Sequence, residues 1–316
     1  MSRIPVVVDA IDDVAADVRL LSLRAANGEP LPPAGPGDHV DLFLREGLVR
    51  QYSLTNGPDD RAHYHLAVKR EPASRGGSVY VHDDLVVGSQ LQISAPRNNF
   101  LLDKGAGPAL LFAGGIGITP ILSMVRYLYA AERVFDLSYF VRDEGSALFQ
   151  GELRAYDGSQ HLYLAHGPDD TRKVVDEALA SMTEAAHVYV CGPAAFMDCV
   201  LDSAVANGFP PEAFHMESFT AAGIVENSDT FEVKLAKAGL TVIVGADETI
   251  AEALLREGFE VELSCEQGIC GTCCVKVLEG VPKHEDQFFT DGEKEKGDQI
   301  CVCVSRSLQG PLLLDL

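Results

Sequence analysis

Residues 265–273 read CEQGICGTC, and this stretch decides the fold of the C-terminal part of the chain. The loop and one distant position supply four cysteines in the plant-type spacing for a [2Fe–2S] cluster, C-x4-C-x2-C followed 30 positions later by the last cysteine. These expected ligands are Cys265, Cys270, Cys273 and Cys303. Gly268 and Gly271 let the loop backbone approach the inorganic sulfides, where a Cβ would obstruct the turn. The sequence therefore predicts a one-electron relay.

Other roles for these cysteines fit the spacing less well. A zinc ribbon needs two C-x-x-C pairs, whereas only Cys270 and Cys273 form one. A thioredoxin-like pair would open a helix in a βαβ unit, without a third cysteine upstream at Cys265. Structural disulfides would indicate secretion, and no signal sequence precedes them, so we expect a reducing, cytoplasmic setting. Cys274 and Cys301 lie beside expected ligands and are interpreted as small buried apolar residues.

Length and composition limit the remaining possibilities. The chain has 316 residues, 47% of them hydrophobic, which suits two or three folded domains. A net charge of −22 argues against nucleic acid or an anionic membrane surface as a partner and permits a basic protein. The uncharged stretch 105–125 contains five glycines and two prolines. We interpret it as a buried strand, a turn and a helix start rather than a membrane span.

Three patterns of secondary structure follow one another along the chain. Up to about residue 102, short strands between turn residues predict an antiparallel barrel or sandwich, with strands around Val6 and at 18–23, 40–44, 52–55, 63–68 and 91–93. The next part alternates strands and helices and predicts a parallel sheet, with strands at 109–113, 135–141 and 187–191 and helices at 121–130 and 171–181. After a small, polar linker at 220–229, two short strands, a helix near 248–256 and the cysteine loop predict a compact mixed unit.

The glycines after strand 109–113 predict a dinucleotide site. Gly115 and Gly117 open the following helix, where free N–H groups and the helix dipole favour a pyrophosphate. A Rossmann fingerprint would have glycine at position 120, where this chain has Pro120, a residue suited to the first turn of a helix. Taken alone, the loop could also be a tight strand–helix turn. The triplet 191–193 (CGP) strengthens the nucleotide interpretation because it ends a strand, where open α/β sheets bind ligands.

The first hundred residues contain the features that a flavin requires. In RQYS, Arg50 and Tyr52 share one face of a strand and Ser53 lies on the other, which offers an aromatic face and a nearby hydroxyl. The sequence RGGS at 75–78 precedes an apparent helix and suits a compact monophosphate. Taken alone, RGGS could equally be a glycine turn with a solvated arginine.

The order of the motifs resembles the phthalate dioxygenase reductase family over essentially the whole chain. The motifs are RQYSLTN (50–56), VKR (68–70), RGGS (75–78), AGGIGITP (113–120), YVCGP (189–193), ESF (217–219) and the cysteine spacing. The resemblance implies an antiparallel β-barrel that binds FMN (1–102), an α/β parallel-sheet domain that binds NAD (103–222), and a β-grasp ferredoxin domain of α+β type (229–316).

The resemblance also implies the roles of individual residues. FMN would contact Arg50, Tyr52, Ser53, Lys69, Arg75, Gly76, Gly77, Ser78, Thr119 and Phe219. The nicotinamide nucleotide would contact Gly114, Gly115, Gly117, Cys191, Gly192 and Pro193. The reacting groups would be flanked by Ser53, Thr119, Cys191 and Phe219. Without the resemblance, Phe219 would be interpreted as a core or linker-anchoring residue.

The last cluster ligand also rests on the resemblance. Cys301 and Cys303 would share one face of an extended strand, so strand alternation does not choose between them. The family's last ligand precedes VSR, which here is residues 304–306. The resemblance therefore implies Cys303.

The number of electrons that each cofactor exchanges explains why NADH, FMN and cluster sites would occur together in one chain. NADH gives up two electrons at once and the cluster accepts one, so a flavin must stand between them. The resemblance implies the reductase component of a multicomponent oxygenase or demethylase, which passes electrons from NADH through FMN and the cluster to a Rieske-type terminal oxygenase. We expect a cytoplasmic monomer that binds neither nucleic acid nor a membrane.

Some alternatives stay open at this point. Asp143 would suit the ribose of NADH and Arg142 a 2′-phosphate, so only the resemblance favours NADH. FMN is favoured over FAD by the compact site at 75–78. A stand-alone NAD(P)H-dependent flavin, ferric or ferredoxin-type reductase would leave the cluster without a clear role. A redox-sensing iron–sulfur regulatory protein would not need both a flavin and a nucleotide site.

Overall fold

The computed structural model describes residues 3–45, 48–71, 76–105, 107–156, 160–182, 186–219, 230–246, 248–259, 261–263, 268, 271–286 and 288–316. The chain divides into two compact units, Met1–Phe219 and Thr220–Leu316. The expected linker at 220–229 lies outside the described residues, and the expected domain boundaries at 102/103 and 222/229 stay predictions. Among the described helices, none combines the length and the apolar character that a membrane span needs.

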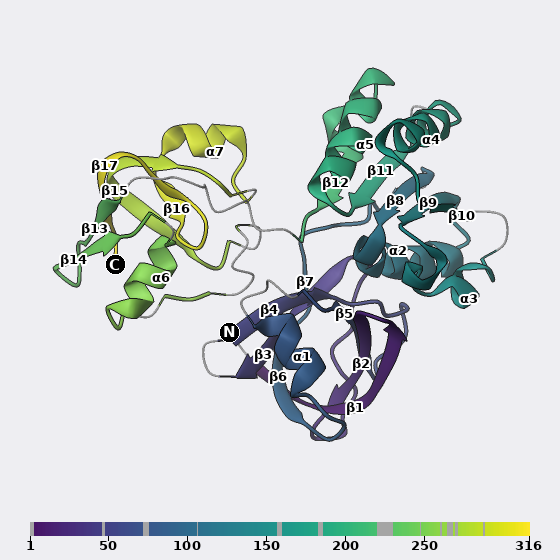
Figure 1. The fold of residues 1–316 in the computed structure, drawn as a ribbon, viewed down its shortest axis with the longest axis horizontal. Coiled ribbons are helices and arrows are strands. Elements are labelled where there is room, and N and C mark those ends of the chain that lie inside the picture. The colour runs from purple at the N-terminus through teal and green to yellow at the C-terminus, as the bar shows by residue number, and fades with distance from the viewer. Residues whose placement is uncertain are drawn as a thin grey trace. The chain divides into compact units, whose positions relative to one another are not determined.

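An antiparallel barrel opens the first unit (Figure 1). Its elements are β1 (Arg3–Ala15), β2 (Val18–Ala25), β3 (Asp38–Arg45), β4 (Leu48–Ser53), β5 (Tyr64–Lys69), α1 (Gly77–Asp83), β6 (Gln90–Ser94) and β7 (Arg97–Asn98). The strands run in the order β4-β3-β6-β1-β2-β5 with β7 beside β3, and each pairing is antiparallel. Just past β4, the Thr55 N–H donates to the His65 carbonyl of β5 at 3.0 Å, which closes the sheet. The predicted barrel is confirmed.

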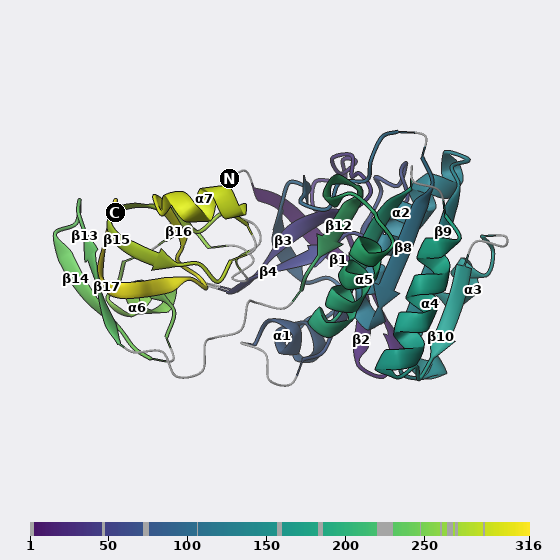
Figure 2. The same ribbon diagram turned by 90° about the horizontal axis from the view of Figure 1, so that it is seen from above.

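A parallel sheet between two layers of helices completes the first unit (Figure 2). Its strands are β8 (Ala109–Gly114), β9 (Phe135–Val141), β10 (Gln160–Leu164), β11 (His187–Cys191) and β12 (Phe214–Glu217), in the order β10-β9-β8-β11-β12. Its α-helices are α2 (Ile118–Ala130), α3 (Gln150–Leu153), α4 (Pro168–Ala180) and α5 (Ala194–Ala206). Helices α2 and α3 share a core with Leu111 and Leu137, while α4 and α5 pack with Leu110 and Val188 on the other face. The predicted α/β architecture is confirmed.

The barrel and the parallel sheet share one hydrophobic core. Val18 and Ala67 of the barrel belong to the same buried cluster as the apolar face of α2. Polar contacts cross at the same place: the Gly37 N–H donates to Ser123 Oγ at 2.9 Å, and the Arg126 guanidinium donates to the Thr55 carbonyl. These contacts hold the ends of the barrel strands beside the middle of α2.

The second unit is a small mixed sheet covered by a helix. Its elements are β13 (Phe231–Leu235), β14 (Leu240–Val244), α6 (Ile250–Arg256), β15 (Cys274–Lys283), α7 (Asp291–Lys296), β16 (Gln299–Cys301) and β17 (Arg306–Leu314). The strand order is β14-β13-β17-β15-β16, with β13 and β17 parallel and the other pairs antiparallel. Thr249 and Glu252 form a capping box that starts α6, whose residues Ile250 and Leu254 pack into the core of the sheet. The predicted β-grasp unit is confirmed.

Candidate functional site

A buried polar cluster lies where the barrel meets the parallel sheet. Ser53 ends β4, Cys191 ends β11 and Glu217 ends β12, and all three residues are buried. Cys191 and Glu217 are partners in the parallel pairing of their strands, so their side chains lie side by side. The Ser53 hydroxyl donates to Glu217 Oε2 at 3.4 Å, across 164 residues of sequence. The barrel and the carboxyl ends of two parallel strands therefore build one site.

Burial keeps two of these groups protonated. It raises the pKa of Glu217 to about 8, and the hydrogen bond from Ser53 opposes this rise only in part. Burial also raises the pKa of the Cys191 thiol well above its usual value, and the Glu217 carboxyl adds to the shift. At neutral pH the site therefore carries a carboxylic acid and a thiol rather than two anions. Such a site can hold a proton, and it is uncharged for as long as the carboxyl and the thiol keep theirs.

The two glycine-containing loops predicted to bind nucleotide lie against each other. Strands β8 and β11 are neighbours, with Ala113 opposite Cys191. A Cβ at Gly117 would come within 2.2 Å of the Cys191 carbonyl oxygen, and one at Gly192 within 3.1 Å of the Gly114 Cα. Only glycines permit this packing of the two loops against each other, and a Cβ at Gly115 would meet no atom within 4 Å, so the backbone is open there for a pyrophosphate. Gly115, which lies between Gly114 and Gly117 in the first of these loops, has a φ of +55°.

The other predicted residues of this region lie at the same edge of the sheet. Thr119 is buried in the first turn of α2, where its hydroxyl donates to the Ile116 carbonyl at 3.1 Å. Pro193 caps the start of α5, and its ring lies beside Gly114. Phe219 is partly buried against the core that contains α2. Their contacts with a nucleotide or a flavin stay predictions.

The two motifs predicted to hold the flavin meet at the start of α1. A Cβ at Gly77 would lie 2.5 Å from Arg50 Cγ, so the Arg50 side chain runs directly over this glycine. Tyr52 is partly buried against the barrel core. The structure thus brings Arg50 of RQYS to the glycines of RGGS, as a shared phosphate site would require. Arg75 lies outside the described residues.

Three further predicted flavin residues have partners within the barrel. Lys69 Nζ lies 2.8 Å from Glu71 Oε1 in an ion pair, so its charge is already partly compensated. The Ser78 hydroxyl accepts a hydrogen bond from the Glu71 N–H at 3.0 Å. Gly76 has a φ of +88° and caps the start of α1. Gly76 and Ser78 flank Gly77 at the start of α1, and Lys69 ends β5.

Two of the four predicted cluster ligands can be placed, and they are neighbours. The Sγ atoms of Cys273 and Cys303 lie 3.1 Å apart and both residues are buried. The neighbouring thiols of Cys301 and Cys303 hold the pKa of Cys273 well below its usual range, which favours the thiolate that binds iron. Cys265 and Cys270 lie outside the described residues. The donor set that can be placed fits a thiolate-bound cluster.

The segment that carries Cys303 differs from the prediction. We expected Cys301 and Cys303 on one extended strand, but β16 ends at Cys301 and Cys303 lies in a turn. The Val304 and Ser305 N–H groups donate to the Cys301 carbonyl at 3.2 and 3.0 Å and reverse the chain there. The expectation of a shared face was therefore wrong. Cys301 instead pairs across the sheet with Cys274, with 2.9 Å between their Sγ atoms.

Comparison with known proteins assigns these features to known domains. The profile of the 2Fe-2S iron-sulfur cluster binding domain matches residues 233–307, and that of the oxidoreductase NAD-binding domain matches residues 111–202. The chain is 45% identical over 316 residues to the vanillate O-demethylase oxidoreductase of Pseudomonas sp. (strain HR199 / DSM 7063), covering 99% of this chain and 100% of the relative. It is 39% identical over 310 residues to the phthalate dioxygenase reductase of Burkholderia cepacia, covering 96% and 95% of the two chains.

The chain belongs to the phthalate dioxygenase reductase family. A solved phthalate dioxygenase reductase, described as a modular structure for electron transfer from pyridine nucleotides to [2Fe-2S], matches with a TM-score of 0.80 and 36% sequence identity. The match covers 100% of this chain and 98% of that structure. This member of the family is an oxidoreductase with a nicotinamide nucleotide domain and a [2Fe–2S] domain.

Glu217 is the residue of this family member that sequence reasoning missed. The motif ESF drew attention to Phe219, whereas the structure places Glu217 at the centre of the polar cluster. The available signal was the position of a carboxylate at the end of a short strand in an α/β sheet, where ligands bind. Its significance depended on contact with Ser53, which no local pattern shows.

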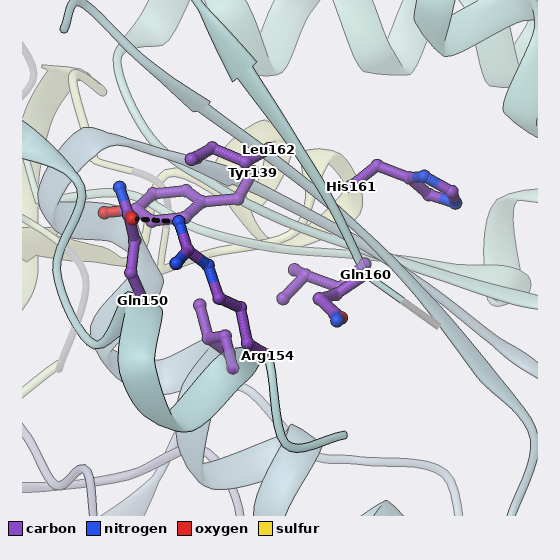
Figure 3. A pocket seen from close by; sticks show the side chains of 8 residues that line it. Tyr139, Gln150, Arg154, Gln160, His161 and Leu162 are labelled. Carbon is purple, nitrogen blue, oxygen red and sulfur yellow. Dashed lines mark hydrogen bonds between the residues drawn. The ribbon is translucent and has the colours of Figure 1, made fainter. Parts of the chain in front are cut away.

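A separate cavity of about 120 Å³ lies at the β10 edge of the parallel sheet (Figure 3). It lies beside α3 and is lined by Leu137, Tyr139, Gln150, Leu153, Arg154, Gln160, His161 and Leu162. None of the predicted site residues is among them. Gln160 and Leu137 pair at the amino end of their strands, the opposite end from the glycine loops. The cavity therefore has no part in the candidate site.

Proposed function

We propose that this chain is the NADH-dependent reductase component of an aromatic oxygenase or O-demethylase system, with FMN as its flavin and a Rieske-type oxygenase as its electron acceptor. The vanillate O-demethylase and phthalate dioxygenase relatives cover it nearly end to end and support an oxygenase partner. We further propose that it acts as a monomer.

One observation carries the proposal. Ser53 of the barrel contacts Glu217 beside Cys191, at the strand ends that also carry the nucleotide loops. A flavin held by Arg50 and Tyr52 on the barrel would therefore meet a nicotinamide held by Gly114, Gly117 and their neighbours. If the contact between Ser53 and Glu217 were only structural, it would not explain why two glycine-containing loops lie at the same carboxyl edge of the parallel sheet.

The residues of the chain contribute positioning and proton storage rather than general acid–base chemistry on a substrate. When bound, the flavin accepts a hydride, two electrons at once, and releases them one at a time. The Ser53 hydroxyl would lie near the meeting point of flavin and nicotinamide, and the uncharged Cys191 residue would lie at the nicotinamide side of it. The protonated Glu217 carboxyl keeps the site free of a fixed negative charge. Close positioning of the reactants is the main contribution of the protein.

Anaerobic mixing with NADH tests the proposal. We expect flavin absorbance to bleach first and the cluster spectrum to follow, and then reoxidation when the purified oxygenase component of a vanillate O-demethylase is added. A stand-alone reductase would transfer no electrons to that component. A redox sensor would show no bleaching by NADH. Light scattering on the same sample gives the mass, and a value twice that of the chain contradicts the monomer.

A further inference from the structure

The segment after β15 lies against both glycines of the cysteine loop. A Cβ at Gly268 would lie 3.0 Å from Asp286 Cα, and one at Gly271 would lie 2.3 Å from Phe288 Cζ. Both glycines have positive φ, +72° and +71°, so neither position accepts a larger residue. We call the residues 284–286 and 288–289 the cover loop. It lies directly on the backbone that carries the cluster ligands.

The cover loop is anchored to the turn that carries Cys303. The Asp286 carboxylate accepts hydrogen bonds from the Ser305 hydroxyl at 2.9 Å and from the Phe289 N–H at 3.1 Å, and His284 Nδ1 lies 2.9 Å from it. Lys294 Nζ of α7 donates to the Asp286 carbonyl at 2.6 Å. These bonds fix the position of the cover loop relative to the turn that carries Cys303 and to α7.

One aromatic ring of the cover loop faces solvent. Phe288 is 44% exposed, whereas the adjacent Phe289 is 7% exposed and belongs to the core. The two rings meet edge to face at 5.1 Å, so the buried ring holds the exposed one in place. Among the large apolar side chains exposed in the described part of this unit, Phe288 is the aromatic one. A rigid exposed ring of this kind is typical of the centre of a protein–protein interface.

Acidic residues follow this ring in the sequence. Phe288 is two residues before Thr290, which caps α7, and the exposed carboxylates of Glu293 and Glu295 lie on that helix. The ammonium of Lys294 is turned back toward the cover loop, while Lys296 of the same helix is exposed. Over residues 284–298 six acidic residues stand against these two lysines. The surface therefore combines an apolar centre with an acidic neighbourhood, in a protein of net charge −22. Its complement is a protein face with an apolar pocket and a basic rim.

We propose that Phe288 is the central contact of the surface on which the oxygenase component docks to receive electrons. The inference rests on the proposed function and deepens it, because it names the face from which electrons leave. One electron passes from the reduced cluster to the redox centre of the oxygenase in each encounter, so the cluster is oxidised as that centre is reduced. Phe288 acts in docking and is not itself oxidised or reduced.

The test compares Phe288→Ala, Phe288→Leu and Ile243→Ala in the holoprotein. Ile243 is 62% exposed on β14, the edge strand at the far side of the sheet from β16, and serves as the matched control. Binding to the purified oxygenase component of a vanillate O-demethylase is measured by calorimetry with both proteins oxidised. We expect the Kd to rise at least about tenfold for Phe288→Ala, less for Phe288→Leu, and not for Ile243→Ala. The rise in Kd should come mainly from a faster dissociation rate rather than from a slower association rate.

Two further readouts make the outcomes decisive. Iron content and the visible cluster spectrum should be unchanged in Phe288→Ala, and so should the rate of cluster reduction by NADH without oxygenase. Equal Kd values for Phe288→Ala and wild type overturn the inference. A slower internal reduction with unchanged Kd also overturns it, because the ring would then serve the chain's own flavin domain. If wild type neither binds nor reduces the oxygenase, the proposed function fails instead.

Discussion

A single carboxyl, Glu217, gives the candidate site its pH dependence. Its pKa in the folded protein is raised from 4.5 to about 8 by burial. Between roughly pH 5 and 8 the folded state holds a proton that the unfolded state has lost, so stability falls as pH rises through this window. The infrared band of a protonated carboxyl should disappear as pH passes about 8.

The variant Glu217→Gln should lack both effects. It cannot lose a proton, so we expect no such infrared band and a flatter dependence of melting temperature on pH. Glu212→Gln, an exposed glutamate just before β12, is the control and should behave as wild type. A band that persists in Glu217→Gln would assign the buried proton to another carboxyl.

Two cysteines two positions apart should behave differently on substitution. Both thiols neighbour the expected ligand Cys273, but Cys301 Sγ also lies 2.9 Å from Cys274, whereas Cys303 Sγ lies 3.1 Å from Cys273 and occupies the position of the last ligand in the family's motif order. Cys303→Ala should therefore abolish the visible cluster spectrum and leave flavin binding intact, because the cage loses a thiolate. Cys301→Ala should retain most of the spectrum. The reverse pattern would make Cys301 the ligand.

The individual residues that could be predicted from the sequence are those whose function only one residue type can perform. Four cysteines and the loop glycines are recognisable because ligation and positive φ restrict the residue type. Glu217 was missed because its role depends on burial and on contact with Ser53, far away in the sequence. Cys303 was predicted to lie on a strand because the alternation of side chains along a strand does not indicate where the strand ends, and here a turn follows Cys301.

At the scale of elements, the start of α1 offers a test of the flavin site. Gly77→Ala would place a methyl group 2.5 Å from Arg50 Cγ and displace the guanidinium. If Arg50 pairs with the flavin phosphate, FMN should bind more weakly by about 1.5–3 kcal/mol, the usual loss of a charge-assisted hydrogen bond. Fluorescence titration of the apoprotein measures this.

The control for this variant is Gly151→Ala in α3, where an added Cβ meets no atom within 4 Å. It should bind FMN as wild type does. Arg75→Ala, predicted from the sequence motif, should weaken FMN to a similar extent. Loss of affinity in Arg75→Ala but not in Gly77→Ala would remove Arg50 from the site.

Many of the strongly patterned elements were predicted, but the 13-residue helix α5, strand β17 and the short edge elements were not. The alternating strands of the barrel and the fully buried β8 appeared near their observed positions, because burial on one face or on both leaves a clear pattern. Strand β10 at the sheet edge is mostly exposed and has no such pattern, and β12 has four residues. Their places are set by neighbouring strands rather than by their own sequence.

At the scale of the whole molecule, charge should control the encounter with the oxygenase. The net charge is −22, and the ferredoxin part is denser in acidic residues than the rest of the chain. Steering by these charges weakens as salt shortens the Debye length. Electron transfer to the oxygenase should therefore slow as salt rises from about 20 to 300 mM, while flavin reduction by bound NADH should hardly change. A flat salt response in stopped-flow measurements would leave solubility as the role of the charge.

The core that the barrel shares with α2 has a consequence for how the protein melts. Val18 and Ala67 are buried in the same cluster as Leu122 and Val125, so exposing either part exposes the other. Three cofactor-binding regions should then give two cooperative transitions in calorimetry, one for residues 1–219 and one for residues 220–316. Ala67→Asp should lower the first transition and leave the second in place. It follows that the ferredoxin part can be exchanged or expressed alone as a cassette, whereas a barrel cut at residue 102 would keep its own core but expose Val18, Ala67, Phe100 and Leu102 to water.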